Sequence, residues 1–471
     1  MARIIVVGAG VAGLAAAARI ASGANDVTLI ERNSSPGGSL NWAFPATLTL
    51  PATLRDLFVK TGGRKASAAG QLEDVVDLRP VDPVRTYRFA DGSSLSLPNA
   101  ARGAAKDAFD AAFGPGAGNA WLRVVDHGNR AWSAIRPSLV EVPDAGRGDL
   151  WRLLRSSASR RALAPRQTLR QMGETAGVRD QRMRNVLDEY ARAAGAAPEK
   201  APAVLAIRPY IEHTFGAWRI VGGLPELAAA LYERCLKRGV SFRFDTEVTS
   251  VASGSVALAD GEKLTTDVIV AAVDAHVLAR LTGSKPAVGT AGYSPSIFSV
   301  KLESEEQQEQ QEPCQLPYET VIFGEGAEPT IRVQVAPEVP SEWIAHADAP
   351  LHGYDHGHGA GQRDWDAPDV ARQHAEAIKK AVAEGLGVRI DTLAVREIFT
   401  PADRERLTGV PGGSAHGPAI DSLTSAILRS PTVQPIKGLL HVGGSSRPGP
   451  GIAFEALSAW NAAEVLRPTR V

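Results

Sequence analysis

The sequence predicts an α/β fold, and three observations support that prediction. A β-type run at residues 4–7 leads through a glycine-rich turn into an alanine-rich helix that extends to about Ser22. A strand, a glycine-rich loop and a helix follow one another again near the C-terminus, from Leu439 to beyond Gly451. Between these two units, strand-like stretches alternate with helices such as 180–194, which is typical of mixed domains.

The composition is that of a globular protein. Its 471 residues suffice for roughly three compact domains. Lysine plus arginine (51) and aspartate plus glutamate (52) nearly cancel, so no overall basic charge points to a nucleic-acid partner. Two cysteines, Cys235 and Cys314, provide no disulfide framework, which fits a reducing compartment. We therefore expect a cytoplasmic protein, and the collagen-like, mucin-like and wholly disordered classes are excluded.

The N-terminal segment has the spacing of a dinucleotide-binding βαβ unit. Gly8, Gly10 and Gly13 form a GxGxxG pattern directly after the first strand. Gly8 allows the tight turn, Gly10 lets the backbone approach a diphosphate, and Gly13 lets helix and strand pack closely. The first helical turn, which includes Val11 and Ala12, offers free N–H groups to phosphates.

The next strand, 27–30, ends at Glu31, eighteen residues after Gly13 (31 minus 13). A carboxylate there accepts hydrogen bonds from ribose hydroxyls and repels a 2′-phosphate. This pattern indicates an adenine dinucleotide but does not separate NAD from FAD. The C-terminal loop, with Gly443, Gly444 and Gly451 before a helix, forms a second cradle, which suits a long cofactor such as FAD better.

The apolar N-terminus has two interpretations. Like a signal peptide, it begins with one basic residue and continues with an apolar run. The glycine pattern and the charge of Arg19 within the helix favour a cytosolic start instead. No later stretch of about 18 uncharged apolar residues occurs, so we expect no transmembrane helix.

Six blocks of sequence carry a family pattern. They are GAGVAGL…LIERNSSPGGSL, TLTLPATLRDLF, HTFGAWRIVGGLPELAAAL, GVSFRFDTEVTSV, TPADRERLTGVPGGSAHG and LLHVGGSSRPGPGI. In this order, and over nearly the whole chain, they resemble the bacterial phytoene desaturase group of the flavin amine-oxidase-like superfamily. The resemblance implies noncovalent FAD, a hydrophobic tunnel for a carotenoid or other isoprenoid-type lipophilic substrate, and peripheral association with the inner face of the membrane.

The resemblance also implies a Rossmann-like FAD-binding domain into which an α+β substrate domain is inserted. The predicted FAD-binding domain consists of residues 1–75, 205–285 and 395–471, and the substrate domain of residues 76–204 and 286–394. The cofactor-binding residues expected on this basis are Gly8, Gly10, Val11, Ala12, Gly13, Glu31, Arg32, Gly37, Gly38, Ser39, Val248, Gly443, Gly444, Gly451 and Ile452.

Such a site needs few catalytic side chains. Flavin N5 takes a hydride from carbon, a neighbouring carbon loses a proton, and an allylic or polyene system spreads the charge. We therefore expect an FAD-dependent oxidoreductase of the desaturase or dehydrogenase type.

Three residues are candidates for a catalytic role. Glu455 is either an acid or base or a carboxylate that stabilises a helix end. Arg447 either balances cofactor charge or faces water, and His416 either titrates near neutral pH or is structural.

Departures from the family pattern leave other functions open. Ser39 replaces a basic residue, and the segment after it is several residues short. Phe454, Glu455 and Trp460 stand where relatives carry small or aliphatic residues, which suits a smaller or more functionalised substrate. The alternatives are a flavin-dependent polyene isomerase, an amine oxidase-like enzyme with a soluble substrate, and a flavin-free binding subunit. An aromatic content of 6% argues against the amine oxidase, whose flavin an aromatic cage would line.

Residues 150–165 predict a basic amphipathic helix. Trp151, Leu150 and Leu154 stand among several arginines there, as in helices that lie on a membrane surface. The other interpretation is a surface helix whose apolar stripe packs on its own domain.

A histidine-rich stretch is a weak candidate for a metal site. His346, His352, His356 and His358 lie near Asp355, and imidazoles with a carboxylate suit zinc. Because a glycine-rich loop does not preorganise these ligands, we expect no metal.

Overall fold

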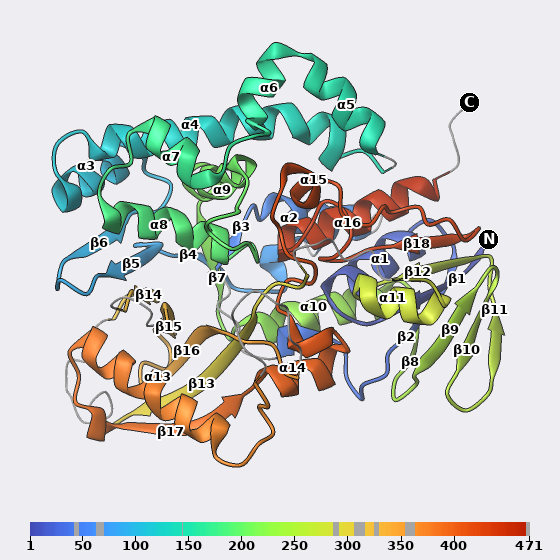
Figure 1. Cartoon of the computed structure of the whole chain (residues 1–471). Helices are drawn as coiled ribbons and strands as arrows, with labels where there is room; N and C mark the ends of the chain where they lie inside the picture. Colours follow the sequence, from blue (N-terminus) through green and yellow to red (C-terminus); the bar gives the residue numbers. More distant parts are fainter. Residues whose placement is uncertain are drawn as a thin grey trace.

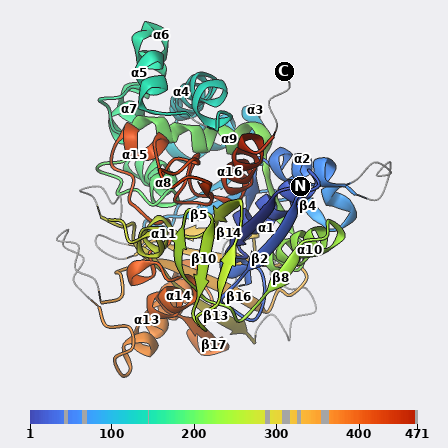
Figure 2. The same ribbon diagram turned by 90° about the vertical axis from the view of Figure 1, so that its right-hand side faces the viewer.

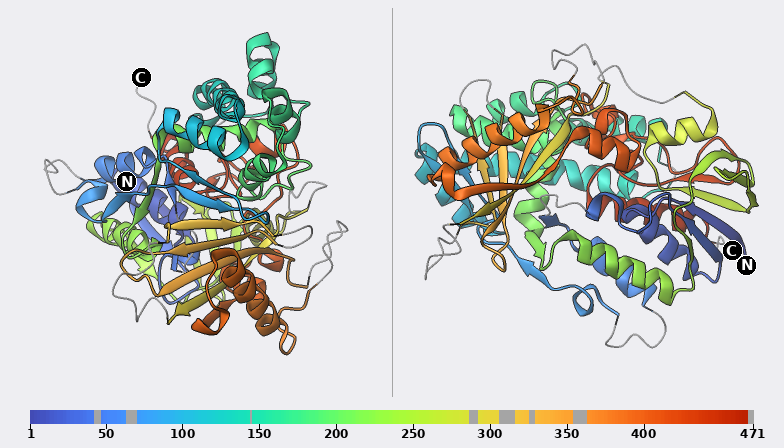
Figure 3. Two further views of the ribbon diagram at one scale, coloured as in Figure 1. Left: turned by 90° about the vertical axis from the view of Figure 1, so that its left-hand side faces the viewer. Right: turned by 90° about the horizontal axis from the view of Figure 1, so that it is seen from below.

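The structure is a computed structural model that describes residues 1–41, 47–62, 70–143, 145–285, 292–305, 316–324, 329–353 and 363–467. A five-stranded parallel sheet and a seven-stranded mixed sheet lie at different ends of the molecule (Figures 1 and 3). A layer of helices packs beside the seven-stranded sheet, and the N-terminus lies near the parallel sheet (Figure 1). The predicted α/β class is confirmed.

The five-stranded sheet has the order β18-β12-β1-β2-β8, and every neighbouring pair is parallel. Its strands are β1 (Arg3–Val7), β2 (Asp26–Ile30), β8 (Ser241–Arg243), β12 (Val268–Ala271) and β18 (Leu439–His441). Ile4 and Val6 face one side of the sheet and Ile5 and Val7 the other, and all four are buried. A strand that is covered on both faces needs such a continuous apolar run.

Helices cover one face of this sheet and a small antiparallel sheet covers the other. The helices are α1 (Val11–Ala21), α2 (Ala52–Thr61), α10 (Leu224–Lys237) and α16 (Ile452–Val465). The other face carries β9 (Val248–Ala252), β10 (Ser255–Leu258), β11 (Lys263–Thr265) and α11 (Ala275–Thr282). The strand order changes direction at β1, because β2 lies on one side of it and β12 on the other. Open α/β sheets bind ligands in the crevice that such a switch point leaves at the carboxyl ends of the strands.

The seven-stranded sheet has the order β17-β13-β16-β15-β14-β5-β6. Its strands are β5 (Arg85–Arg88), β6 (Ser94–Leu97), β13 (Ser296–Ser304), β14 (Glu319–Ile322), β15 (Ile331–Val335), β16 (Glu342–Ala349) and β17 (Leu393–Phe399). Helix α13 (Val370–Leu386) packs on one face through Ala375, Ile378 and Val382. A three-stranded sheet of β3 (Leu48–Thr49), β7 (Ala217–Ile220) and β4 (Leu78–Pro80) lies between the two large sheets.

The helical layer contains α3 (Arg102–Phe113), α4 (Ala117–Ile135), α5 (Arg147–Arg155), α6 (Ser157–Leu163), α7 (Leu169–Ala176), α8 (Gln181–Arg192) and α9 (Ile207–Phe215). Trp121 and Phe109, which stack with ring centroids 4.5 Å apart, anchor α3 and α4 to this layer. Helix α14 (Pro401–Thr408) and helix α15 (Leu423–Ile427) follow later in the chain.

The predicted division into five segments stays a prediction. Each large sheet takes strands from separate stretches of the chain, and β17 crosses the predicted boundary at 394/395. The single helix expected at 150–165 is two helices, because Ser156 adopts an extended conformation and caps α6. These two helices project from the top of the molecule in Figures 1 and 2. None of the described helices is long and apolar enough to cross a membrane.

Candidate functional site

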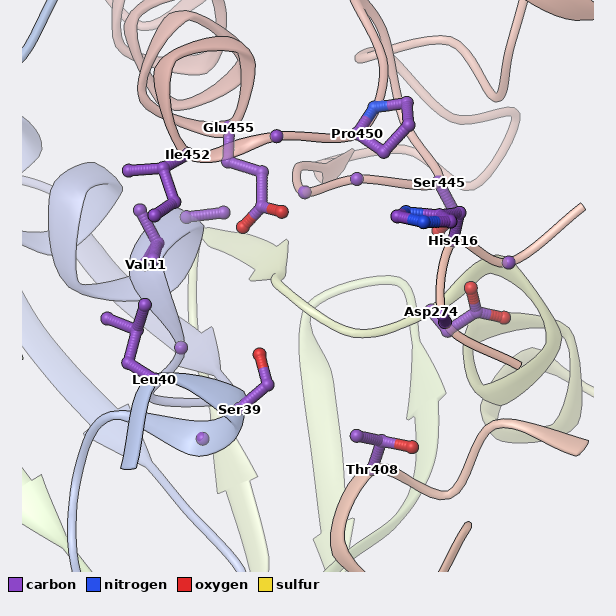
Figure 4. A pocket seen from close by; sticks show the side chains of 18 of the residues that line it. Val11, Ser39, Leu40, Asp274, Thr408, His416, Ser445, Pro450, Ile452 and Glu455 are labelled. Carbon is purple, nitrogen blue, oxygen red and sulfur yellow. The ribbon is translucent and has the colours of Figure 1, made fainter. Parts of the chain in front are cut away.

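A cavity of about 590 Å³ lies where the two glycine-rich loops meet. Residues of the first loop and of α1 line it together with residues of the second loop and of α16, although more than 400 residues of sequence separate them. In Figure 4, Val11, Ile452 and Glu455 face this common space from the two helix ends. Gly443 and Ala12 are in contact range, because a Cβ on Gly443 would lie 3.8 Å from the Cβ of Ala12.

The first loop has the geometry that the glycine pattern predicts. Gly8 has a φ of +102°, and a Cβ there would lie 2.6 Å from the carbonyl oxygen of Ala272. A Cβ on Gly13 would lie 1.9 Å from the carbonyl oxygen of Gly8, so only glycine allows helix α1 to pack this closely on the turn. Gly10 instead has no protein atom within 4 Å of its Cβ position. The backbone at Gly10 is therefore open to a ligand.

Both helix ends at the cavity lack a side-chain cap. Gly10 precedes α1 and Gly451 precedes α16, and neither supplies a side-chain acceptor for the first-turn N–H groups. Because these groups have no partner within their helices, and the positive ends of both helix dipoles face the cavity, the site favours an anionic ligand such as a diphosphate.

Glu31 ties the first loop to the end of β2. One oxygen of its carboxylate accepts the Ala9 N–H at 2.7 Å, and the other accepts the Asn33 N–H at 2.9 Å. Glu31 is buried and lines the cavity, so its remaining lone pairs can still accept a ribose hydroxyl. Besides its predicted role in binding the ribose, Glu31 therefore holds the glycine-rich loop in place.

The other expected cofactor residues divide into cavity-lining and supporting positions. All of them line the cavity except Gly13 and Gly37. Gly37 lies behind the wall, where its N–H donates to the Ala9 carbonyl at 2.8 Å. Arg32 lines the cavity, but its guanidinium donates to the carbonyls of Arg406 and Leu407 at the end of α14. Arg32 therefore joins the wall to α14 in addition to any contact with a ligand.

Glu455 points into the cavity from the first turn of α16 (Figure 4). Burial raises the pKa of its carboxyl to about 7, and a hydrogen bond with the Gly451 backbone lowers that pKa only in part. The positive helix end alone would keep the carboxylate ionised. Because burial outweighs it, Glu455 can exchange a proton near neutral pH.

His416 also lines the cavity, but it does not titrate as expected. Burial, together with the positive charges of Arg208, Arg404 and Arg429, lowers its pKa to about 3. Of the two interpretations of His416, titration near neutral pH is therefore disfavoured, and its ring is neutral at that pH.

Arg447 does not line the cavity within the described part of the chain. Its Nε donates to the Arg429 carbonyl at 3.0 Å, and its backbone N–H donates to the Ser430 carbonyl at 3.1 Å. As a correction to the sequence-based candidate, Arg447 makes these hydrogen bonds with the backbone beside the second loop, and its side chain is not part of the described cavity lining.

Of the histidines considered as metal ligands, the structure describes His346 and His352. His346 is buried in β16, where it hydrogen-bonds Ser299 at 2.8 Å, and residues 355–358 lie outside the described residues. His352 does come near Asp364 and Asp366, but Arg406 already pairs with Asp366 at 3.0 Å.

The family follows from comparison of the sequence with known families. The model of the flavin containing amine oxidoreductase family matches residues 71–320, which is more than half of the chain, and an NAD(P)-binding Rossmann-like domain matches residues 6–43. The chain belongs to the flavin-containing amine oxidoreductase family. This flavoenzyme is an oxidoreductase that uses FAD. Its two matched regions agree with the resemblance to phytoene desaturases that the six sequence blocks indicated.

Relatives of known function include two hydroxyneurosporene desaturases. The protein from Rubrivivax gelatinosus is 25% identical over 98% of this chain and 93% of its own length. The protein from Cereibacter sphaeroides is 27% identical over 98% of this chain and 97% of its own length. A 4,4'-diapolycopene oxygenase from Methylomonas sp is 29% identical, but that alignment covers 57% of this chain and only 55% of the relative.

Solved structures share the fold. Putrescine oxidase bound to putrescine superposes with a TM-score of 0.62 and 13% identity over 99% of this chain and 98% of that one. An oxidoreductase from Methanosarcina mazei gives a TM-score of 0.61 at 14% identity, over 98% of this chain and 100% of that one. At such low identity these likenesses confirm the predicted two-part α/β architecture of the flavoenzyme and nothing beyond it.

Sequence reasoning missed the charged side chains that line the rest of the cavity. Most of them come from the seven-stranded sheet and the helical layer, and Arg404 comes from α14; they include Arg85, Glu189, Arg192, Arg208, Glu212, Glu319, Arg332, Asp348 and Arg404. One signal was present in the sequence. Glu319 in ETVI and Arg332 in IRVQV are charged residues within short apolar strands, where ionisable side chains are rare unless they are paired or functional.

Most of these charges form ion pairs. Arg85 lies 3.0 Å from Glu212 and 2.7 Å from Glu319. Arg332 contacts Glu189 and lies 3.1 Å from Asp348.

Replacing Glu31 with alanine is expected to weaken FAD binding by about tenfold or more, because the loop loses its charge-assisted anchor at Ala9 and the ribose loses an acceptor. FAD binding is measured by titrating apoprotein and following the protein fluorescence. Glu262→Ala, which removes an exposed carboxylate between β10 and β11, is the matched control. Equal FAD affinity in Glu31→Ala and wild type would refute the assignment.

Glu455 should also make stability depend on pH. Its pKa is raised in the folded protein, so the neutral carboxyl stabilises the fold at low pH, and this stabilisation is lost as the pH rises through about 7. Between about pH 5 and 8, the free energy of unfolding should fall by about 1–3 kcal/mol more in wild type than in Glu455→Gln. Denaturant titrations measure this, with Glu233→Gln on the exposed side of α10 as control. Parallel pH profiles for wild type and Glu455→Gln would contradict the burial argument.

Proposed function

We propose that this flavoenzyme desaturates a lipophilic polyene of the isoprenoid type. A hydride leaves one carbon, a proton leaves its neighbour, and a carbon–carbon double bond forms. Two observations together support this substrate class: the full-length relatives are hydroxyneurosporene desaturases, and apolar side chains such as Leu50, Ile211, Ile297 and Phe454 line the cavity between its charged groups. The full-length match to these desaturases carries most weight.

The residues of both loops would hold FAD. The N–H groups at the starts of α1 and α16 would bind its anionic and carbonyl oxygens, and Glu31 would bind the ribose. Bound FAD supplies a two-electron acceptor that takes the hydride. The open position at Gly10 fits this role because a side chain there would occupy the ligand's space.

The protein's own contribution to the reaction is orientation and proton transfer. Apolar lining groups exclude water and hold the substrate chain beside the second loop. Glu455, whose pKa is about 7, is the group that we propose takes up the proton lost from carbon. His416, being neutral, can orient a polar group of the substrate without adding charge.

An amine substrate fits this cavity less well. Among the described lining residues, Tyr190 and Phe454 are the only phenyl-type rings, which falls short of an aromatic cage around a flavin. The experiment below therefore includes an amine substrate only for comparison with the polyenes.

Under anaerobic conditions, an isoprenoid polyene should bleach the flavin absorbance of the holoenzyme, whereas putrescine should not. The panel includes polyenes with hydrocarbon, hydroxyl and carboxylate end groups, and free FAD with each compound is the control. Bleaching by putrescine alone would replace desaturation with amine oxidation. A cis–trans change of the polyene without net bleaching would point to isomerisation.

We also propose that α5 and α6 contact a membrane surface from which the substrate is taken. Trp151 on α5 is 72% exposed, and Arg152, Arg155, Arg160 and Arg161 surround it as exposed residues. Leu150 packs into the core of the helical layer and so holds α5 in place. Trp151, the next residue, does not share in this packing and stays exposed for contact with a membrane. An exposed tryptophan among arginines suits an anionic bilayer.

Trp151→Ser is expected to reduce flotation with phosphatidylglycerol vesicles several-fold, because it removes the one large apolar group exposed beside the arginines. Vesicle flotation followed by quantification of the bound protein measures the effect. Val59→Ser, at a 55% exposed position on α2, is the control. If both variants float like wild type, α5 and α6 are not the membrane contact.

A further inference from the structure

Arg208 is a cation in the cavity without a carboxylate partner. It lies in the first turn of α9, lines the cavity, and donates from Nη2 to the Pro450 carbonyl at 3.3 Å. No carboxylate of the described residues forms an ion pair with it. Burial alone lowers the pKa of its guanidinium to about 10, which still leaves the side chain charged at neutral pH. Arg208 is only partly exposed, and a charge that is partly removed from water without a carboxylate partner is costly, so its presence here needs an explanation.

The surroundings of Arg208 are positive. Arg332 and Arg404 line the same cavity, and Arg429 lies close behind the second loop, where it donates to the carbonyls of Gly444 and Pro418. Arg208 and Arg429 raise the local positive potential, because each lowers the pKa of His416. The positive end of helix α16 adds to this potential.

The carboxylates near this region are already engaged. Glu189 and Asp348 pair with Arg332. Asp274 accepts the N–H of His276 at 2.8 Å and so caps α11. Glu455, with a pKa of about 7, carries only part of a negative charge at neutral pH. Arg208 is thus a cation in the lining that forms no ion pair with a carboxylate of the described residues.

We propose that Arg208 binds a carboxylate at one end of an otherwise apolar substrate, with His416 as a second hydrogen-bond donor. This inference rests on the proposed function and narrows its substrate to a polyene acid. A guanidinium binds a carboxylate through two parallel hydrogen bonds, and such a pair recovers the cost of burying the cation. The apolar chain would lie along Ile211, one turn further along the same helix, which also lines the cavity.

The test compares two ligands with the same polyene chain. All-trans-retinoate and all-trans-retinol are titrated into the FAD-loaded enzyme, and binding is followed by the change in the flavin spectrum. Wild type should bind retinoate at least about tenfold more tightly than retinol, as expected for a charge-assisted pair. Arg208→Gln should lose this preference while its affinity for retinol and its FAD content stay the same, and Arg208→Lys should restore part of it.

A control separates a specific site from a general positive field. Arg280→Gln removes an exposed arginine that lines the same cavity from α11, and it should keep the preference for retinoate. Equal binding of the two retinoids by wild type, or an unchanged preference in Arg208→Gln, would overturn the proposal. The proposal would also be overturned if Arg208→Gln lost FAD or had a shifted flavin potential but still preferred retinoate to retinol. Arg208 would then act on the cofactor and not on the substrate carboxylate.

Failure of the proposed function is a separate result. If neither retinoid changes the spectrum of fully FAD-loaded enzyme, the polyene substrate is refuted, and dodecanoate against dodecanol becomes the matched pair for the anion site. A preference for dodecanoate that Arg208→Gln abolishes would support the carboxylate site on its own. No preference for dodecanoate would overturn it as well.

Discussion

The site depends on the packing of α1 against α16. Both helices bury alanines at their contact, among them Ala15, Ala16 and Ala459, and small side chains allow the helix axes to approach closely. As a result, the N-terminal ends of both helices open into one cavity, and Gly443 comes into contact range of Ala12. Two uncapped helix ends that open into the same cavity concentrate unpaired N–H groups there, and a ligand with oxygen acceptors completes such an arrangement.

Burial acts in opposite directions on the two titratable groups that face this cavity. It raises the pKa of Glu455 to about 7 and, with nearby arginines, lowers the pKa of His416 to about 3. Both shifts favour the uncharged form. At neutral pH neither group therefore carries a full charge, and neither supplies a countercharge for Arg208.

The charged wall of the cavity indicates what kind of substrate the flavoenzyme accepts. A hydrocarbon tunnel needs no buried ions, yet Arg85 and Arg332 each form two ion pairs at this wall. These pairs connect β5, β14, β15 and β16 with α8 and α9, so part of their role is to join the seven-stranded sheet to the helical layer. An ionised wall also disfavours an entirely apolar substrate. Such a substrate would displace water from the charged groups without replacing the hydrogen bonds that the water makes to them. The wall thus agrees with the functionalised substrate that the departures around Phe454 and Glu455 suggested.

The sequence alone determined the first βαβ unit, the second glycine loop with its helix, and the residues of these two loops that line their shared cavity. These features are local: a turn that only glycine adopts, or a strand that ends in a carboxylate, is written in a few consecutive residues. The tertiary structure alone decided which charges face the cavity, because Arg85, Arg208, Glu319 and Arg332 come from strands and helices that are distant in sequence. It also decided the protonation of Glu455 and His416 and the place of Arg447, since burial and neighbouring charges exist only once the chain has folded.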